Sequence, residues 1–201
     1  GGVQTYTYDT AGSLATAKDA LNRTTTYAYN TAGRLTSVTA PNSGVTAYTY
    51  DANGNVLTET DPLGHVTTHT YDVMNRVTVD GDALLNQTHY AYDDAGRLTS
   101  VTDPLSHATT YSYDAANRTT TVTDPLGHAT TFAYDNANRR TGVTDALSRT
   151  TTFAFNAAGR LTSVTDPAGN ATSYGYDIAG RQTTVTLPSG AVTTRAYDVR
   201  G

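Results

Sequence analysis

Polar and apolar residues alternate along most of the chain in short runs that turn-forming residues separate. Residues 24–29 read Thr-Thr-Thr-Tyr-Ala-Tyr, and residues 97–102 read Arg-Leu-Thr-Ser-Val-Thr. A period of two, with many Thr, Tyr and Val, is typical of half-buried β-strands. Tyr27 and Tyr29 share one face of their strand, with Thr25 beside them. The pattern therefore predicts short strands joined by turns.

The second type of strand is less regular. Leu98 and Val101 are three residues apart, so regular pleating would send their side chains to opposite faces. Two explanations fit this spacing. Either both faces of the sheet are partly covered, or a β-bulge brings the two residues onto one face.

The whole pattern returns every 21 residues without an insertion or deletion. The pair Tyr-Asp marks each return, and Tyr29-Asn30 and Phe155-Asn156 complete the series. A fixed unit length is expected when each repeat must lie in register on its neighbour. The other members of the series begin at Tyr8, Tyr50, Tyr71, Tyr92, Tyr113, Tyr134, Tyr176 and Tyr197.

The first turn of each repeat follows this pair and has Gly or Asn at its fourth place. Gly and Asn are the residues that adopt a positive φ most easily, which predicts a left-handed residue there. An Asp at the first place can accept hydrogen bonds from the turn backbone. Together they predict a type I turn closed by a left-handed residue, a common hairpin connection. The fourth places are Gly12, Gly33, Gly54, Asn75, Gly96, Asn117, Asn138, Gly159, Gly180 and Gly201.

The second turn of each repeat is typified by Asp-Pro-Leu-Gly at residues 124–127. Asp, Pro and Gly in this order are preferred at the first, second and fourth places of a type I turn. Every Pro of the chain lies at this phase, so none interrupts a strand. These residues are Pro41, Pro62, Pro104, Pro125, Pro167 and Pro188.

Two all-β architectures suit a strict repeat of this kind. In the first, hairpins continue into one antiparallel sheet of roughly 18 to 20 strands, which must curl into a tube, spiral or shell wall because open sheets rarely exceed about ten strands. In the alternative, each repeat is one coil of a parallel β-solenoid. The hairpin-type turns favour the antiparallel array. We expect residues 1–201 to be a single array of nine complete repeats with partial ends, cut from a longer chain.

Composition narrows the possible functions. Only 37% of the residues are hydrophobic, with no Cys and no Trp, which predicts a thin core and excludes disulfides and thiol chemistry. A net charge of −5 without a basic stripe argues against nucleic-acid binding. No apolar run approaches the roughly 20 residues that a membrane-spanning helix needs.

The candidate sites for chemistry are weak. His65, His107 and His128 share one phase, but neighbouring repeats would hold them about 9.6 Å apart, too far to share a metal ion. His65 and His69 would lie about 13 Å apart on a strand. We therefore predict no metal site and treat these side chains as surface or turn residues.

Charged residues have structural explanations as well. Arg follows the first turn in seven repeats, four places after Asp in most of them, which predicts an Asp–Arg ladder paired across strands; the alternative is a stripe that binds an anionic ligand. Glu59 and Asp80 replace the Val of the second strand, with Asp82 nearby, and could act as acid and base or hold Ca²⁺. Without a calcium-loop spacing, we interpret them as local degeneration of the repeat. The Arg residues are Arg34, Arg76, Arg97, Arg118, Arg139, Arg160 and Arg181.

The repeat resembles the YD repeats of the RHS family, which includes bacterial polymorphic toxins, toxin-complex subunits and teneurins. The resemblance covers the whole chain and is clear at Tyr113, Asp114, Asn117, Arg118 and residues 124–128. It implies an antiparallel β-ribbon that spirals into a hollow, non-catalytic shell, in the toxins around an effector domain, and an extracellular or cell-surface location. The segment lacks the RHS core motif, and a strictly regular array has no built-in end, which also allows a filament or tube.

We therefore predict a non-catalytic extracellular scaffold that forms a β-sheet fibre, tube or shell wall. The alternatives are a segment of a toxin-enclosing shell and a carbohydrate-binding surface. The expected partners are neighbouring repeats or other copies, an enclosed effector domain, or surface glycans, and we expect no cofactor and no catalytic residue. The repeat signature consists of Tyr8, Asp9, Gly12, Tyr29, Gly33, Arg34, Tyr50, Asp51, Gly54, Tyr71, Asp72, Tyr92, Asp93, Gly96, Arg97, Tyr113, Asp114, Asn117, Arg118, Tyr134, Asp135, Asn138, Arg139, Phe155, Gly159, Arg160, Tyr176, Asp177, Gly180, Arg181, Tyr197 and Asp198.

Overall fold

The computed structural model describes residues 3–198, and all regular structure in this range is β-strand. The strands alternate between lengths of mostly six and five residues, as the two strand types of each repeat predict. Residues 3–198 contain no helix of the length and apolarity needed to cross a membrane. The strands are β1 (Thr5–Tyr8), β2 (Leu14–Lys18), β3 (Thr24–Tyr29), β4 (Leu35–Thr39), β5 (Val45–Tyr50), β6 (Val56–Thr60), β7 (Val66–Tyr71), β8 (Val77–Gly81), β9 (Gln87–Tyr92), β10 (Leu98–Thr102), β11 (Ala108–Tyr113), β12 (Thr119–Thr123), β13 (Ala129–Tyr134), β14 (Arg140–Thr144), β15 (Thr150–Phe155), β16 (Leu161–Thr165), β17 (Ala171–Tyr176), β18 (Gln182–Thr186) and β19 (Val192–Thr194).

The chain divides into two compact units. The first unit extends to Tyr92 and also contains Ser100–His107. The second unit contains Asp93–Thr99 and the chain from Ala108 onward. The division passes through strand β10, and the hairpins on either side of it are of the same kind.

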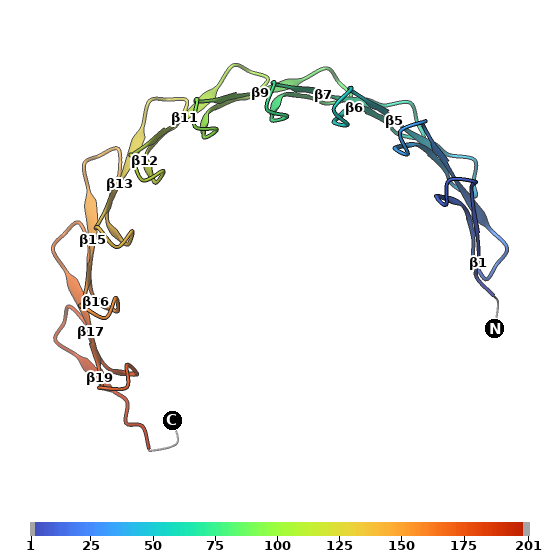
Figure 1. The fold of residues 1–201 in the computed structure, drawn as a ribbon. Helices are drawn as coiled ribbons and strands as arrows, with labels where there is room; N and C mark the ends of the chain where they lie inside the picture. Colours follow the sequence, from blue (N-terminus) through green and yellow to red (C-terminus); the bar gives the residue numbers. More distant parts are fainter. Residues whose placement is uncertain (1–2, 199–201) are drawn as a thin grey trace. The chain divides into compact units, whose positions relative to one another are not determined.

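Strands pair antiparallel with their neighbours in the chain within both units. In the first unit the pairs run from β1–β2 to β8–β9. In the second they run from β11–β12 to β18–β19. Figure 1 shows the strands of each unit side by side in chain order. The predicted antiparallel hairpin array is confirmed, and the alternative of a parallel β-solenoid is wrong.

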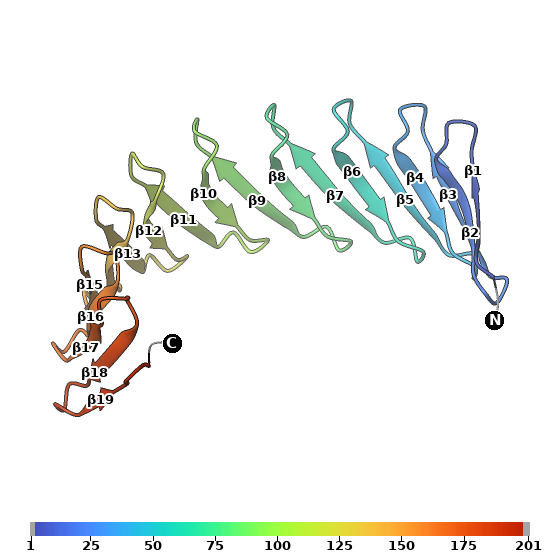
Figure 2. The ribbon, with the colours of Figure 1, turned by 60° about the horizontal axis from the view of Figure 1, so that its bottom comes forward.

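The two kinds of turn lie at opposite edges of each unit. Because consecutive strands are antiparallel, first turns gather at one strand end and second turns at the other. Figure 2 shows this in the first unit, from blue to green, where the loops alternate between the two edges. The two edges therefore carry different side chains, and we call them the first-turn edge and the second-turn edge.

A β-bulge settles the irregular spacing in the second strand. In the hairpin β3–β4, Tyr27 pairs with Val38 and Tyr29 with Leu35, while the register shifts between Ala28 and Tyr29. Leu35 and Val38 thus reach the face that carries both Tyr side chains, although they are three residues apart. The bulge is one of the two explanations that the sequence left open. The same shift occurs in seven further hairpins.

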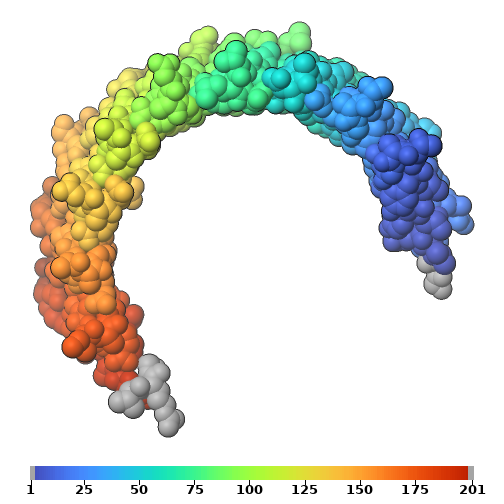
Figure 3. All heavy atoms as spheres, viewed as in Figure 1, coloured from blue at the N-terminus to red at the C-terminus, as the bar shows by residue number. Residues whose placement is uncertain are grey.

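The sheet is a single layer, and its packing lies between neighbouring hairpins. In β3, Thr25, Tyr27 and Tyr29 are half-buried while the residues between them are exposed. No hydrophobic side chain among the described residues is fully buried. Figure 3 shows the first unit nearly edge-on, without a second layer against it. Cross-strand contacts on each face must therefore supply the packing energy that a core supplies in a globular domain.

Candidate functional site

The Asp at the start of the first turn organises the turn backbone. In the turn after β11, Oδ1 of Asp114 accepts hydrogen bonds from the backbone N–H groups of Ala116 (2.9 Å) and Arg118 (3.0 Å). Its Oδ2 accepts a hydrogen bond from Nε of Arg118 at 2.7 Å. Hydrogen bonds from the backbone and side chain of Arg118 hold the pKa of Asp114 below its ordinary value. The carboxylate therefore stabilises the turn in its charged form.

The fourth place of the first turn is left-handed, as predicted. Asn117 has a φ of 63° and Gly159 a φ of 78°. The N–H of Asn117 donates to the carbonyl of Asp114 at 3.1 Å, which closes a type I turn. The same conformation occurs at every described fourth place, and Gly201 lies outside the described residues.

The Arg that follows the turn reaches from its own hairpin to the next one. Nη1 of Arg118 donates to the carbonyl oxygen of Asp135 (2.8 Å) and to Oδ1 of Asn138 (3.0 Å), both in the following repeat. Its guanidinium carbon lies 4.8 Å from the ring centroid of Tyr134, within cation–π range. One side chain thus binds a carboxylate in its own turn and three groups in the next repeat.

The Tyr of the repeat signature returns a bond in the opposite direction. The hydroxyl of Tyr134 donates to the carbonyl of Thr119 in the preceding repeat at 2.9 Å. Tyr176 donates in the same way to Leu161 at 2.7 Å. We call this pair of links, Arg to the next repeat and Tyr to the preceding one, the inter-repeat contact. It explains why Tyr, Asp and Arg recur together.

The Arg link of the inter-repeat contact recurs along both units. The guanidinium carbon lies 4.4 to 5.9 Å from the aromatic ring of the next repeat. The pairs are Arg34–Tyr50, Arg76–Tyr92, Arg97–Tyr113, Arg118–Tyr134, Arg139–Phe155, Arg160–Tyr176 and Arg181–Tyr197. The predicted Asp–Arg pairs are therefore present, and each pair lies within its own turn. The contact of the same Arg with the next hairpin was not predicted.

The second turn repeats the backbone scheme of the first turn, a similarity that the sequence did not predict. Asp124 accepts hydrogen bonds from the backbone N–H groups of Leu126 and His128, and Gly127 is left-handed with a φ of 84°. Ser106 and even Leu85 adopt the same conformation, at 66° and 67°. Because residues other than Gly occupy this place in several repeats, the sequence does not mark it as left-handed. The recurring Pro indicates a turn but not the conformation of its fourth residue.

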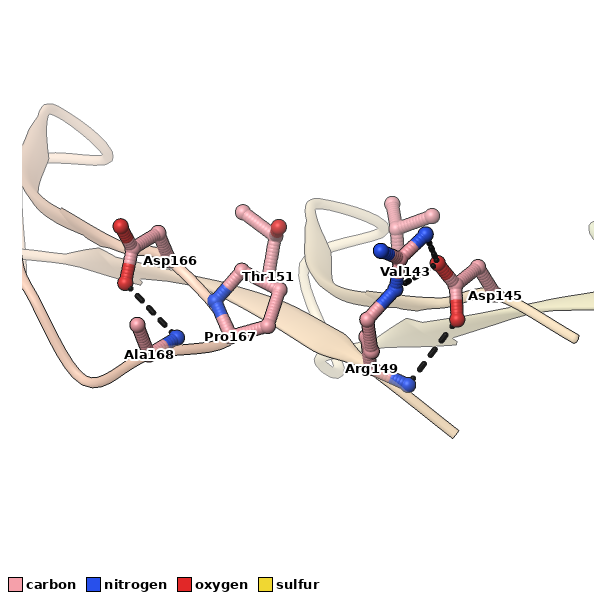
Figure 4. Close-up of a pocket in the computed structure, with 7 residues that line it drawn as sticks. All are labelled: Val143, Asp145, Arg149, Thr151, Asp166, Pro167 and Ala168. Carbon is pink, nitrogen blue, oxygen red and sulfur yellow. Dashed lines mark hydrogen bonds and ion pairs between the residues drawn. The ribbon is translucent and has the colours of Figure 1, made fainter. Parts of the chain in front are cut away.

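Within residues 3–198, the second turns make no contact comparable to the inter-repeat contact. Arg149 pairs with Asp145, with Nη2 and Oδ2 separated by 2.6 Å, and its side chain is 62% exposed. Figure 4 shows this pair in the second unit, beside a groove that Pro167 and Ala168 of the next turn also line. Asp166 binds the backbone of its own turn across the groove. Arg149 and Arg139 both pair with the Asp of their own turn, but only Arg139 also contacts the next repeat, so Arg149 serves as a control for Arg139.

Three His residues at the second turns are bound to carboxylates. His65, His107 and His128 each place Nδ1 within 2.8 to 3.0 Å of an Asp of their own second turn. Residues 3–198 contain no group of three or more His, Asp or Glu side chains arranged to hold a metal ion.

His69 and Asp80 form a cross-strand pair. His69 Nδ1 lies 2.6 Å from Oδ1 of Asp80, directly opposite on the neighbouring strand, and Tyr90 donates to Oδ2 of Asp80 at 3.3 Å. These two positions hold Tyr27 and Val38 in the hairpin β3–β4. An apolar cross-strand pair has therefore been exchanged for a polar one at the same register. We interpreted Asp80 as local degeneration of the repeat and did not predict its pairing with His69.

The fold and the inter-repeat contact define a β-hairpin repeat array. Residues 3–154 match the family described as Teneurin YD-shell, and residues 155–192 match the RHS repeat. The chain belongs to the Teneurin YD-shell family. This confirms the resemblance to the RHS and YD repeats. No curated protein matches the chain in sequence.

Solved structures show the same fold at low sequence identity. A crystal structure of TcdB2–TccC3–TEV has a TM-score of 0.66 and 17% identity, covering 92% of this chain and 11% of that chain. TcdB2–TccC3 without its hypervariable C-terminal region has a TM-score of 0.60 and 18% identity, covering 92% and 12%. The Tc holotoxin pore of Photorhabdus luminescens has a TM-score of 0.56 and 17% identity, covering 92% and 13%. The chain therefore spans about one-eighth of these structures.

Proposed function

We propose that the chain is a non-catalytic stretch of wall in a larger secreted or cell-surface protein. In this proposal residues 1–201 are one continuous array of nine complete repeats with partial ends, and the array curls as part of a hollow shell. The observation that carries the proposal is the inter-repeat contact. The signature side chains, such as Arg118 and Tyr134, use their polar groups to bind the next or the preceding hairpin. They build a continuous sheet and leave few groups for a ligand.

The relatives favour a shell over a free fibre. The matching family is described as a YD-shell, and the structures of similar fold are assemblies of TcdB2 with TccC3. We therefore propose that the partner of the full-length protein is an effector domain enclosed by the array. The wall would need no cofactor, because hydrogen bonds and stacked side chains hold it together.

Carbohydrate binding has less support from the contacts. Sugar rings stack on exposed aromatic faces, but a guanidinium group lies over the aromatic ring in all seven inter-repeat contacts, for example Arg97 over Tyr113 at 4.8 Å. The hydroxyl of Tyr113 is also bound, to the carbonyl of Leu98 at 2.8 Å. We therefore leave glycan binding out of the proposal.

A protection experiment on the full-length protein tests the proposed wall. The double variant Arg118→Ala/Arg139→Ala removes two adjacent inter-repeat contacts, and Arg23→Ala/Arg149→Ala removes two Arg–Asp pairs at second turns, where no such contact exists. We expect the domain that the array encloses to resist added protease in the wild type and in the control. The first variant should lose this resistance.

Electron microscopy of the same samples gives the second measurement. Closed hollow particles are expected for the wild type. Uniform fibres of indefinite length, or a protected domain in all three proteins, would contradict the proposal of an enclosing wall.

A further inference from the structure

Three side-chain positions recur wherever one hairpin pairs with the next, and we call each such pairing of two strands a joint. In the joint between β12 and β13 these positions hold Arg118, Val122 and Phe132. Arg118 lies over Tyr134 of the next repeat. Val122 and Phe132 share one face of adjacent strands, two residues out of direct register, which is within reach of an aromatic side chain. A typical joint thus combines one cation–π contact with one apolar contact.

The joint between β6 and β7 differs from this pattern at all three positions. Asn55 stands in the place of the Arg, Glu59 in the place of the Val, and His69 in the place of the aromatic residue. Glu59 is the only Glu of the chain. Every other joint within residues 3–198 keeps at least one of the three side chains. The departures from the repeat therefore meet at one place in the sheet.

The first-turn edge of this joint is held by neutral groups. Asn55 carries no charge, so this part of the described chain lacks the cation–π contact that Arg makes in seven other joints. Its Nδ2 donates instead to Oδ1 of Asn75 at 2.7 Å. The hydroxyl of Tyr71 still donates to the carbonyl of Val56 at 2.9 Å. The two hairpins thus stay in register but are bound less strongly.

The middle of the joint is polar and open to water. Glu59 is exposed, whereas Val38 and Val122 at the same position are half-buried. His69 bonds within its own hairpin, because its Nδ1 lies 2.6 Å from Oδ1 of Asp80 on β8. Glu59, His69 and Asp80 also line a groove of about 420 Å³. Water therefore reaches these strands on the face that apolar side chains cover in a typical joint.

We propose that the joint between β6 and β7 is a built-in opening point, at which the interior of the array separates first. Because each hairpin contacts only its neighbours, the cost of opening a joint depends on the side chains of that joint. Segments with few apolar contacts and with backbone hydrogen bonds near water open most readily. The joint between β2 and β3 also lacks the Arg, with Ser13 in its place, but it keeps the aromatic residue Tyr27. The opening requires no enclosed domain, so it stands apart from the proposed function.

Hydrogen exchange of the 201-residue chain at pH 7, read by mass spectrometry, tests the proposal. We expect the backbone amides that join β6 to β7 to exchange on the order of tenfold faster than those that join β12 to β13. The variant Asn55→Arg/Glu59→Val/His69→Tyr restores the recurring side chains and should remove this difference. It should fold, because a Tyr directly opposite a carboxylate already occurs in the pair Tyr48–Glu59.

Glu59 provides a second measurement, because a glutamate-specific protease can cut the chain at this residue only. The variant Glu59→Val/Val122→Glu moves the cleavage site to the joint between β12 and β13, which keeps Arg118 and Phe132. We expect the folded wild type to be cut on the order of tenfold faster than this variant, and both to be cut equally fast in urea. Equal exchange at the two joints, a difference that survives the triple substitution, or equal cleavage of the folded proteins would each overturn the proposal. Circular dichroism checks that every variant retains its β-structure.

Discussion

At the scale of the residue, the first place of the turn decides where its Arg lies. Where this place is Asp, as in Asp135, the carboxylate holds Nη2 of Arg139 at 2.6 Å. Where it is Asn156, no such ion pair holds Arg160, whose guanidinium carbon lies 5.8 Å from the ring of Tyr176 instead of 4.8 Å. Arg160 then occupies the space that a Cβ at position 180 would need. A larger residue at position 180 would make the flexible side chain of Arg160 move, and the φ of 88° at this position favours Gly in any case.

Arg139 and Arg149 provide a matched pair of substitutions. Arg139→Ala removes an ion pair, a hydrogen bond to the carbonyl of Asn156 and the contact with Phe155. Arg149→Ala removes only an exposed ion pair. We expect Arg139→Ala to lower the free energy of unfolding by about 1 to 2.5 kcal/mol. Arg149→Ala should cost at most about 1 kcal/mol. Urea unfolding checks this, and equal effects would contradict the role of the inter-repeat contact.

The turn carboxylates predict how stability depends on pH. The side-chain hydrogen bond from Arg76 is the main cause that lowers the pKa of Asp72, and the backbone hydrogen bond from Arg118 is the main cause for Asp114. Because the folded pKa values lie below the unfolded value of about 3.9, this stabilisation is complete above that pH and is lost as the pH falls through the folded values. We expect the urea midpoint to drop steeply below about pH 4.

Asp114→Asn is the control for this pH dependence. Asn156 shows that an amide oxygen can accept the same two backbone hydrogen bonds, from Ala158 and Arg160. The variant should therefore fold, and its midpoint should fall less between pH 5 and pH 2 than that of the wild type. An identical acid dependence in both proteins would show that Asp114 does not contribute to it.

Leu85 is strained, and relieving this strain should stabilise the chain. Its φ is 67° and its side chain is 86% exposed. A left-handed L-residue costs roughly 1–2 kcal/mol, and Gly loses roughly 0.5–1 kcal/mol in backbone entropy. We therefore expect Leu85→Gly to raise the free energy of unfolding by up to about 1 kcal/mol in urea titrations. Leu84→Gly, at a residue without positive φ, should lower it instead.

At the scale of the element, the hairpin depends on its bulge and on the Tyr that binds the preceding repeat. The bulge places Leu161 opposite Phe155 and Val164 opposite Phe153. In this hairpin the repeat-signature aromatic is Phe, so it has no hydroxyl to donate. Tyr134, at the same position of the preceding repeat, donates to the carbonyl of Thr119. Hairpins with the same backbone thus differ by one hydrogen bond.

Phe155→Tyr should add this hydrogen bond. The acceptor would be the carbonyl of Arg140, which stands fifteen residues earlier, as Thr119 does for Tyr134. We expect a gain of about 0.5–1.5 kcal/mol, and a similar loss for Tyr134→Phe. Urea midpoints of both variants measure the effect. If Phe155→Tyr leaves the midpoint unchanged, the bond does not form in that hairpin.

At the scale of the whole molecule, stability belongs to the contacts between consecutive hairpins. With no fully buried hydrophobic side chain in the described range, no single core holds either unit together. Each hairpin pairs only with its neighbours, which is the condition for stability to grow with the number of repeats.

Removing one complete repeat should therefore leave a folded chain. Deleting residues 114–134 joins Tyr113 to Asp135 and preserves the phase of every turn. We expect an unchanged β-sheet spectrum and a smaller urea m value, in proportion to the surface lost. Deleting residues 114–133, one residue fewer, shifts the register and turns apolar side chains to the opposite face. Cooperative unfolding of the second variant would contradict this account.

Much of the local structure could be predicted from the sequence because it depends on neighbours in the chain. The alternating pattern at Thr25, Tyr27 and Tyr29 predicts strand β3, and Asp9 together with Gly12 predicts the turn after β1. The left-handed fourth place of the second turn was harder to recognise, because Leu85 and three Ser residues occupy a place that Gly or Asn fills in the other repeats. Pairing of His69 with Asp80 also depends on a register that the two residues do not themselves encode.

The sequence by itself determined the unit length, the strand types and the turn chemistry, since each follows from side chains within a few residues of one another. Only the tertiary structure decided that a bulge unites Leu35 with Val38, and that Arg118 binds Tyr134 of the next repeat. The physical reason is separation along the chain. These contacts join residues on different strands, so they exist only after antiparallel pairing has fixed which residues face each other.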